Sequence, residues 1–193
     1  MGRARGGILS LVQDYRRAQI KSLTRKIGVY ALCDLDGVPI YVGQSKDGIQ
    51  QRVRRHLTSA RSDIIANRLI DPWEIAFVQA YPVESASEIP RLEASVFATF
   101  HDEKPLMNGS VPRVSGRLLK RLPKPAEIIQ MLPDKEIQVR RDPALRLPRQ
   151  IEHIGRLVDH ILTVKDSRRH ARRRAPTAHR LLPSAFRPLL PNS

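Results

Sequence analysis

Two tripeptides that combine glycine with tyrosine stand near the start of this sequence, each inside a short apolar segment. They are Gly28-Val29-Tyr30 and Tyr41-Val42-Gly43, with ten residues between the two tyrosines. A phenol can orient or deprotonate a water molecule when nearby cations lower its pKa from the usual value of about 10. Strand tyrosines also serve simply to fill a core with their rings. The glycines either permit a close approach of another group or merely end the strands.

Arg52 and His56 are four residues apart on a helix that the apolar spacing predicts from a cap at Asp47 to about Ala60. Side chains four apart lie on one stripe of a helix. This stripe lies beside the inward one, so we expect both residues to border the core without entering it. An arginine there can neutralise charge on a phosphate, and a histidine titrates close to neutral pH. The simpler alternative is a solvated flank. The inward stripe consists of Ile49, Val53, Leu57 and Ala60.

Glu93 falls inside the apolar face of a second helix, predicted from about Glu88 to His101. A carboxylate on that face should be buried, and a buried carboxylate must be paired, protonated or bound to a metal. From the residues alone, an ion pair with Arg91 or Arg52 and a metal site are both open.

In this order, the two tripeptides, Arg52, Glu93 and Asn108 closely resemble the signature of the GIY-YIG nuclease superfamily. Valine replaces isoleucine at both middle positions, which keeps a β-branched residue there. The resemblance covers about residues 27 to 108. His56, one turn after the arginine, is especially similar to the family's restriction endonucleases. In the family the asparagine helps to fix the active-site geometry; its simpler role is that of a turn residue.

The resemblance implies a divalent-metal-dependent endonuclease that hydrolyses phosphodiester bonds of DNA by in-line displacement. Glu93 would hold one Mg²⁺, for which Mn²⁺ could substitute, and Arg52 would neutralise charge developing on the phosphate. Tyr30 would position or deprotonate the attacking water, assisted by Tyr41 or His56. His56 is also a credible base in its own right, so the choice of general base between Tyr30 and His56 stays open.

The chain of 193 residues is strongly basic, with 34 Lys and Arg against 19 Asp and Glu and a formal net charge of +15. Such an excess favours a polyanionic partner, because cations that neutralise phosphates release counterions. We expect this partner to be DNA, contacted by the helix that bears Arg52 and by a basic, flexible tail. The predicted phosphate contacts are Lys46, Arg54, Arg55, Arg168, Arg169, Arg172, Arg173 and Arg174.

Apolar periodicity predicts alternating strands and helices, preceded by an amphipathic helix and followed by a proline-interrupted region. The expected strands are Ile27–Cys33, Val38–Val42 and Trp73–Ala80, with Ser85 or Ser87 capping the helix that bears Glu93. A late amphipathic helix carries Ile151, Ile154, Leu157, Val158, Ile161 and Leu162. With the resemblance, this gives an α+β fold: a small three-stranded antiparallel sheet flanked by helices, with helical N-terminal and C-terminal extensions. The expected divisions are a helical extension at 1–25, a nuclease core at 26–110, a proline-interrupted helical region at 111–164 and a basic tail at 165–193.

No apolar run approaches the length of a membrane span, so we expect a cytoplasmic protein that does not contact a membrane. Within the family, a restriction-type or stand-alone nuclease fits best, and because restriction members often act as dimers, a homodimer is one expectation. The competing function is a non-catalytic nucleic-acid-binding protein of the same fold. RNA cleavage is less favoured, because only 5% of residues are aromatic and single-stranded RNA is usually bound by stacking on aromatic side chains.

Overall fold

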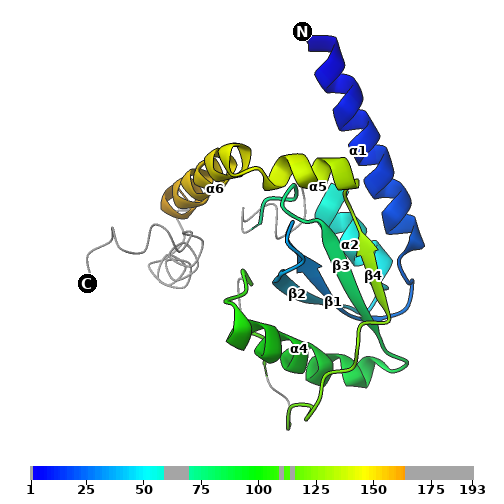
Figure 1. The fold of residues 1–193 in the computed structure, drawn as a ribbon. Helices are drawn as coiled ribbons and strands as arrows, with labels where there is room; N and C mark the ends of the chain where they lie inside the picture. Colours follow the sequence, from blue (N-terminus) through cyan, green and yellow to red (C-terminus); the bar gives the residue numbers. More distant parts are fainter. Residues whose placement is uncertain (1, 59–69, 109–110, 114–115, 164–193) are drawn as a thin grey trace.

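The computed structural model of the chain describes residues 2–58, 70–108, 111–113 and 116–163. It has an α+β architecture in which one antiparallel sheet lies between helices (Figure 1). In chain order the elements are α1 (Gly2–Ser22), β1 (Gly28–Cys33), β2 (Pro39–Ser45), α2 (Ile49–Thr58), β3 (Phe77–Pro82), η1 (Ala86–Glu88), α4 (Ile89–Glu103), β4 (Glu127–Gln130), α5 (Asp134–Arg141) and α6 (Pro143–Thr163).

The sheet has four strands in the order β2-β1-β3-β4, not the three that the sequence predicts. The hairpin of β1 and β2 is confirmed, and β3 pairs with the other side of β1. The additional strand, β4, pairs antiparallel with β3, with Val78 opposite Ile129. Its four residues lie in the proline-rich region, and so short an apolar run carries no periodicity by which a strand could be recognised. β4 therefore makes the proline-rich region part of the sheet.

All six residues of β1 are buried, because helices cover both faces of the sheet at this central strand. Tyr30 and Leu32 pack with residues of α1 and α2, whereas Val29 and Ala31 pack with α4 on the opposite face. Figure 1 shows α4 lying along one side of the sheet, away from α2. Cys33 ends the strand in the core as expected, and burial raises the pKa of its thiol to about 12.

The first helical residue of α2 is Ile49, and Asp47 is not its cap. Asp47 lies two residues earlier, where its N–H donates to the Ser45 hydroxyl. The N-cap residue of α4 is Glu88, which makes no side-chain cap bond, so the predicted serine cap of this helix is not observed; Ser85 instead caps the short 3-10 helix η1 that precedes α4. The Ser85 side chain accepts a hydrogen bond from the Ser87 N–H, and Glu88 Oε1 accepts the Ser85 N–H at 2.9 Å. These two bonds form a capping box.

The sequence predicts that Trp73 begins a strand, and this is wrong. Trp73 lies in a turn ahead of β3 and is only partly buried. Two guanidinium groups lie over its indole ring, with Cζ of Arg16 on α1 at 4.9 Å and Cζ of Arg140 on α5 at 4.7 Å from the ring centroid. A tryptophan face attracts cations through its quadrupole, and this contact joins the two helices. The strand begins at Phe77 because the preceding residues form this turn.

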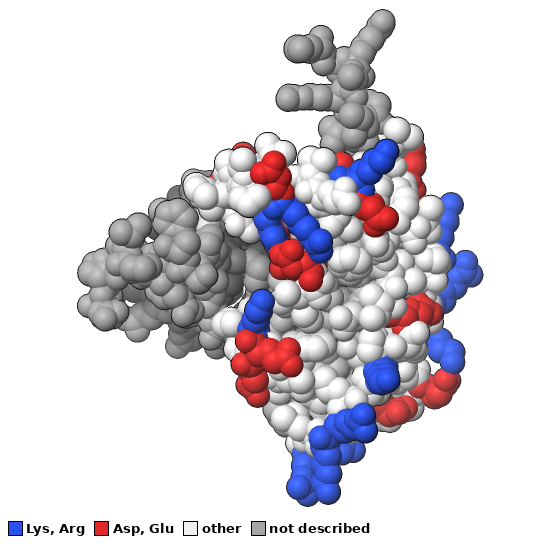
Figure 2. All heavy atoms as spheres, in the orientation of Figure 1, with Lys and Arg blue, Asp and Glu red and all other residues white. Residues whose placement is uncertain are grey.

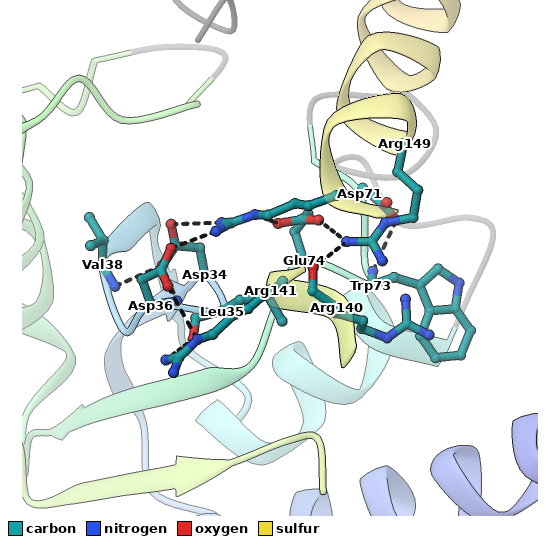
Figure 3. A network of polar contacts seen from close by, with 11 residues as sticks. Asp34, Leu35, Asp36, Val38, Asp71, Trp73, Glu74, Arg140, Arg141 and Arg149 are labelled. Atoms are coloured by element: carbon teal, nitrogen blue, oxygen red, sulfur yellow. Dashed lines mark hydrogen bonds and ion pairs between the residues drawn. The ribbon is translucent and has the colours of Figure 1, made fainter. Parts of the chain in front are cut away.

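The C-terminal helices α5 and α6 are attached to the sheet by an ionic network of arginines and carboxylates (Figure 3). Glu74 accepts from Arg146 at 3.1 Å and from Arg149 at 2.5 Å. Asp36, in the turn between β1 and β2, receives Arg146 at 2.6 Å and Arg141 at 3.2 Å. Because these carboxylates occupy the arginines, much of the positive charge of this region is neutralised within the protein.

α6 turns Arg146 and Arg149 to the sheet domain and leaves Ile151 and Val158, two residues of its predicted apolar stripe, largely in solvent. Ile151 is 50% exposed and Val158 is 41% exposed. The sequence predicts the helix correctly, but the network of Arg146 and Arg149 decides which side faces the protein. Among the described residues, no helix is long and apolar enough to cross a membrane.

Candidate active site

Tyr30 and His56 form a buried hydrogen bond between the sheet and α2. The Tyr30 hydroxyl lies 2.6 Å from Nε2 of His56, and the two residues are 0% and 2% exposed. His56 therefore enters the core instead of bordering it, which corrects the sequence-based expectation. The reason is the partner: a phenol on the covered face of β1 satisfies an imidazole that would otherwise be costly to bury.

Tyr41 completes a cluster of three rings. Its centroid lies 6.3 Å from that of Tyr30 and 5.8 Å from that of His56, and the Tyr30 and His56 centroids are also 5.8 Å apart. Tyr41 is the only one of the three that keeps appreciable exposure. The cluster thus links a partly accessible phenol to an internal phenol–imidazole pair.

Gly43 gives the Tyr30 ring room to cross the neighbouring strand. The two residues are opposite each other in the register of β1 and β2. A Cβ atom at Gly43 would lie 2.5 Å from the Tyr30 hydroxyl oxygen and 2.8 Å from Cε1 of Tyr41. Of the two roles that the sequence leaves open for this glycine, it therefore permits the close approach of another group, here the Tyr30 ring. The second tripeptide needs a glycine because the first carries a tyrosine.

Asn108 holds the outer edge of β2. Its side-chain carbonyl accepts the Val42 N–H at 3.1 Å, and its amide donates to the Val42 carbonyl at 2.6 Å. Beside it, the Met107 N–H donates to the Ile40 carbonyl at 2.7 Å. These bonds imitate a neighbouring strand at the residue after Tyr41. The sequence does not predict this contact, because it does not show which backbone groups the side chain of Asn108 bonds.

Ser45 is a buried polar residue to which the sequence analysis gave no role. Its hydroxyl donates to the Gly48 carbonyl at 2.8 Å, which shapes the loop between β2 and α2. Arg52 lies one turn before His56 on α2 and is partly buried. The loop and the helix together bring Arg52 to the same layer as the ring cluster.

Glu93 lies on α4, which packs on the opposite face of the sheet from α2. Its side chain is partly buried, and burial raises the pKa of its carboxyl above the usual range. No other described residue forms a hydrogen bond or ion pair with it. Arg91 instead donates to the Arg117 carbonyl at 2.9 Å. Of the three states open to a buried carboxylate, pairing with Arg91 or Arg52 is therefore not observed.

A divalent cation would suit this carboxylate, since it offers a hard oxygen donor that no residue in the described part of the chain occupies. The described residues contain no group of three or more His, Cys, Asp or Glu that could enclose a metal. A cation at Glu93 would therefore depend on water and substrate oxygens for its other ligands, as Mg²⁺ commonly does.

The predicted phosphate contacts on and before α2 are on the surface. Lys46, Arg54 and Arg55 are all exposed, and Arg55 lies 3.9 Å from Asp47. The predicted contacts in the tail, from Arg168 to Arg174, lie outside the described residues.

Residues 26–105 match the family model described as the GIY-YIG catalytic domain. The match begins just before β1 and ends after α4, so it includes the ring cluster, Arg52 and Glu93 but not Asn108. Comparison with the curated proteins and with the solved structures gives no significant match.

Proposed function

Because residues 26–105 belong to the GIY-YIG family of nuclease domains, we propose that this protein is a divalent-metal-dependent endonuclease that hydrolyses phosphodiester bonds of DNA. The observation that carries the proposal is the buried bond between Tyr30 and His56, with Tyr41 beside it. A phenol joined to an imidazole is a group through which a proton can leave an attacking water.

In this mechanism the proton leaves through Tyr30. Since Nε2 of His56 is bonded to the Tyr30 hydroxyl, His56 acts through the phenol: as water gives a proton to the Tyr30 oxygen, Tyr30 passes its own proton to Nε2 of His56. Tyr41, the more exposed phenol, orients the scissile phosphate or the water. Arg52 neutralises charge on the phosphate oxygens in the transition state.

Glu93 is the residue that would hold Mg²⁺ or Mn²⁺, and Asn108 keeps β2 in place under Tyr41. When bound, the cation supplies Lewis-acid stabilisation of the leaving oxygen. This assignment is supported by the partial burial of the Glu93 carboxylate, which has no hydrogen-bond or ion-pair partner among the described residues. As a restriction-type or stand-alone nuclease, the protein would act in the cytoplasm. It would form a homodimer, as restriction members of the family often do.

The competing function is a nucleic-acid-binding protein that keeps the fold without catalysis. The enclosure of Tyr30 and His56 and the position of α4 on the opposite face favour it, because both rings then serve only the core.

Cleavage of supercoiled plasmid by the full chain, in Mg²⁺ and in chelator, separates the two functions. We expect nicked and linear products in Mg²⁺ alone. Tyr30→Phe should slow cleavage by about 10²-fold or more, the usual contribution of a positioned acid–base group. Tyr81→Phe is the matched control, because Tyr81 also lies in the sheet but bonds Gln79 outside the cluster. Binding of DNA without cleavage by the unmodified protein would favour the competing function.

A further inference from the structure

The segment from Gly116 to Ala126, between α4 and β4, is here called the basic strap. It contains four cationic residues and no acidic one, and all four are exposed: Arg117, Lys120, Arg121 and Lys124. In Figure 2, Lys and Arg side chains cover the lower tip of the molecule, below α4 in the view of Figure 1. An irregular segment that keeps only one sign of charge is an electrostatic surface for a partner of the opposite sign.

The strap cations differ from the arginines of the C-terminal helices in having no carboxylate partner among the described residues. Arg140, Arg141, Arg146 and Arg149 each contact Asp or Glu, so their charge is largely balanced. The nearest carboxylate by chain position is that of Glu127, and it accepts the Thr24 N–H at 2.9 Å. The strap therefore presents four cations in one short segment whose charge no described carboxylate balances.

The backbone of the strap is fixed against α4. The Leu119 N–H donates to the Ser95 hydroxyl at 3.0 Å, and Arg91 donates to the Arg117 carbonyl at 2.9 Å. Leu119 and Leu122 pack against the core cluster on the α4 side. A fixed backbone lowers the entropy lost on binding, and surface segments held by a rigid scaffold commonly carry binding functions.

We propose that the basic strap binds the phosphate backbone of duplex DNA. The inference rests on the proposed function and adds a contact surface separate from the ring cluster, since the strap packs with α4 whereas the ring cluster packs with α2. Its lysines and arginines bind without reading sequence, because phosphate contacts position a duplex and base contacts specify it.

The test measures duplex binding by the full chain in chelator, so that cleavage does not interfere. The strap variant combines Lys120→Gln, Arg121→Gln and Lys124→Gln. The control combines Arg17→Gln, Lys21→Gln and Lys135→Gln, which removes the same charge from exposed positions on α1 and α5. Since each lost phosphate contact lowers the salt slope of log K by about 0.9, the strap variant should flatten it by about 2 to 3. The control should stay close to the unmodified protein.

A second variant, Lys120→Arg with Lys124→Arg, keeps the charge and should retain the original slope and affinity. Equal losses in the two neutralised variants, or a strap variant that binds like the unmodified protein, would overturn the proposal. If the unmodified protein cleaves plasmid in Mg²⁺ while the strap variant binds normally, only this inference fails. If the unmodified protein neither binds nor cleaves duplex DNA, the proposed function itself fails.

Discussion

The hydroxyl oxygen of Tyr30 lies 2.6 Å from Nε2 of His56, with both side chains enclosed between β1 and α2. This contact connects the first tripeptide to the helix that carries Arg52. In the proposed mechanism it also ties catalysis to folding, because the same bond that would move a proton satisfies two buried polar groups.

Removal of either partner should therefore destabilise the protein as well as slow DNA cleavage. Tyr30→Phe or His56→Leu alone should cost about 1–3 kcal/mol of unfolding free energy, because each change removes the buried Tyr30–His56 hydrogen bond. The double variant should lose less than the sum, with a coupling of about 0.5–3 kcal/mol. Urea denaturation of the four proteins measures the cycle. Strict additivity would mean that the bond contributes nothing to stability.

Gly43→Ala should disrupt the ring cluster directly. The new methyl group would meet the Tyr30 hydroxyl and the Tyr41 ring, and overpacking of this kind costs about 1–3 kcal/mol. Thermal unfolding and plasmid cleavage should both show a loss. Gly155→Ala is the control: among the described residues, no atom beyond the neighbouring helix backbone lies within 4 Å of its Cβ position on α6, so the change should stabilise by about 0.5–1 kcal/mol. A tolerated Gly43→Ala would contradict the close packing.

Asn108 should prove to be a positioning residue of β2. Asn108→Ala removes both bonds to Val42, and at about 0.5–1.5 kcal/mol for each bond the loss should be measurable by denaturation. Asn108→Asp keeps an acceptor for the Val42 N–H but sets an oxygen against the Val42 carbonyl, so it should not rescue cleavage. Recovery of full activity in Asn108→Asp would show that the amide donor is dispensable.

Glu93→Gln should change how stability depends on pH. Burial raises the pKa of the Glu93 carboxyl in the folded chain above its unfolded value of about 4.5. When the pKa of a group is raised in the folded state, its favourable contribution to the free energy of unfolding is complete below the unfolded pKa. This contribution is lost as the pH rises through the folded pKa. Without metal, Glu93→Gln should therefore be more stable than the unmodified protein at neutral pH, and the difference should shrink toward pH 4.

Added Mg²⁺ tests whether the Glu93 carboxylate binds a metal. A ligand that binds only the folded state raises the melting temperature, so Mg²⁺ should stabilise the unmodified protein and leave Glu93→Gln unchanged. Equal Mg²⁺ responses in the two proteins would place the cation elsewhere.

The sequence by itself determines the elements and the chemically capable residues. Alternating and helical periodicities depend only on neighbours along the chain, and they predict the hairpin, α2 and the helix that bears Glu93. The ordered tripeptides, Arg52 and Glu93 indicate the family, which the match at residues 26–105 confirms.

Tertiary structure decides which of these residues meet. Tyr30 and His56 are 26 positions apart, and Asn108 reaches Val42 across 66, so their bonds depend on how α2 and the α4–β4 segment cross the sheet. Periodicity assigns a face to His56 but not a partner, and only the partner makes its burial favourable. β4 and the outward stripe of α6 follow the same rule. Both are fixed by contacts between distant segments, which local propensity does not encode.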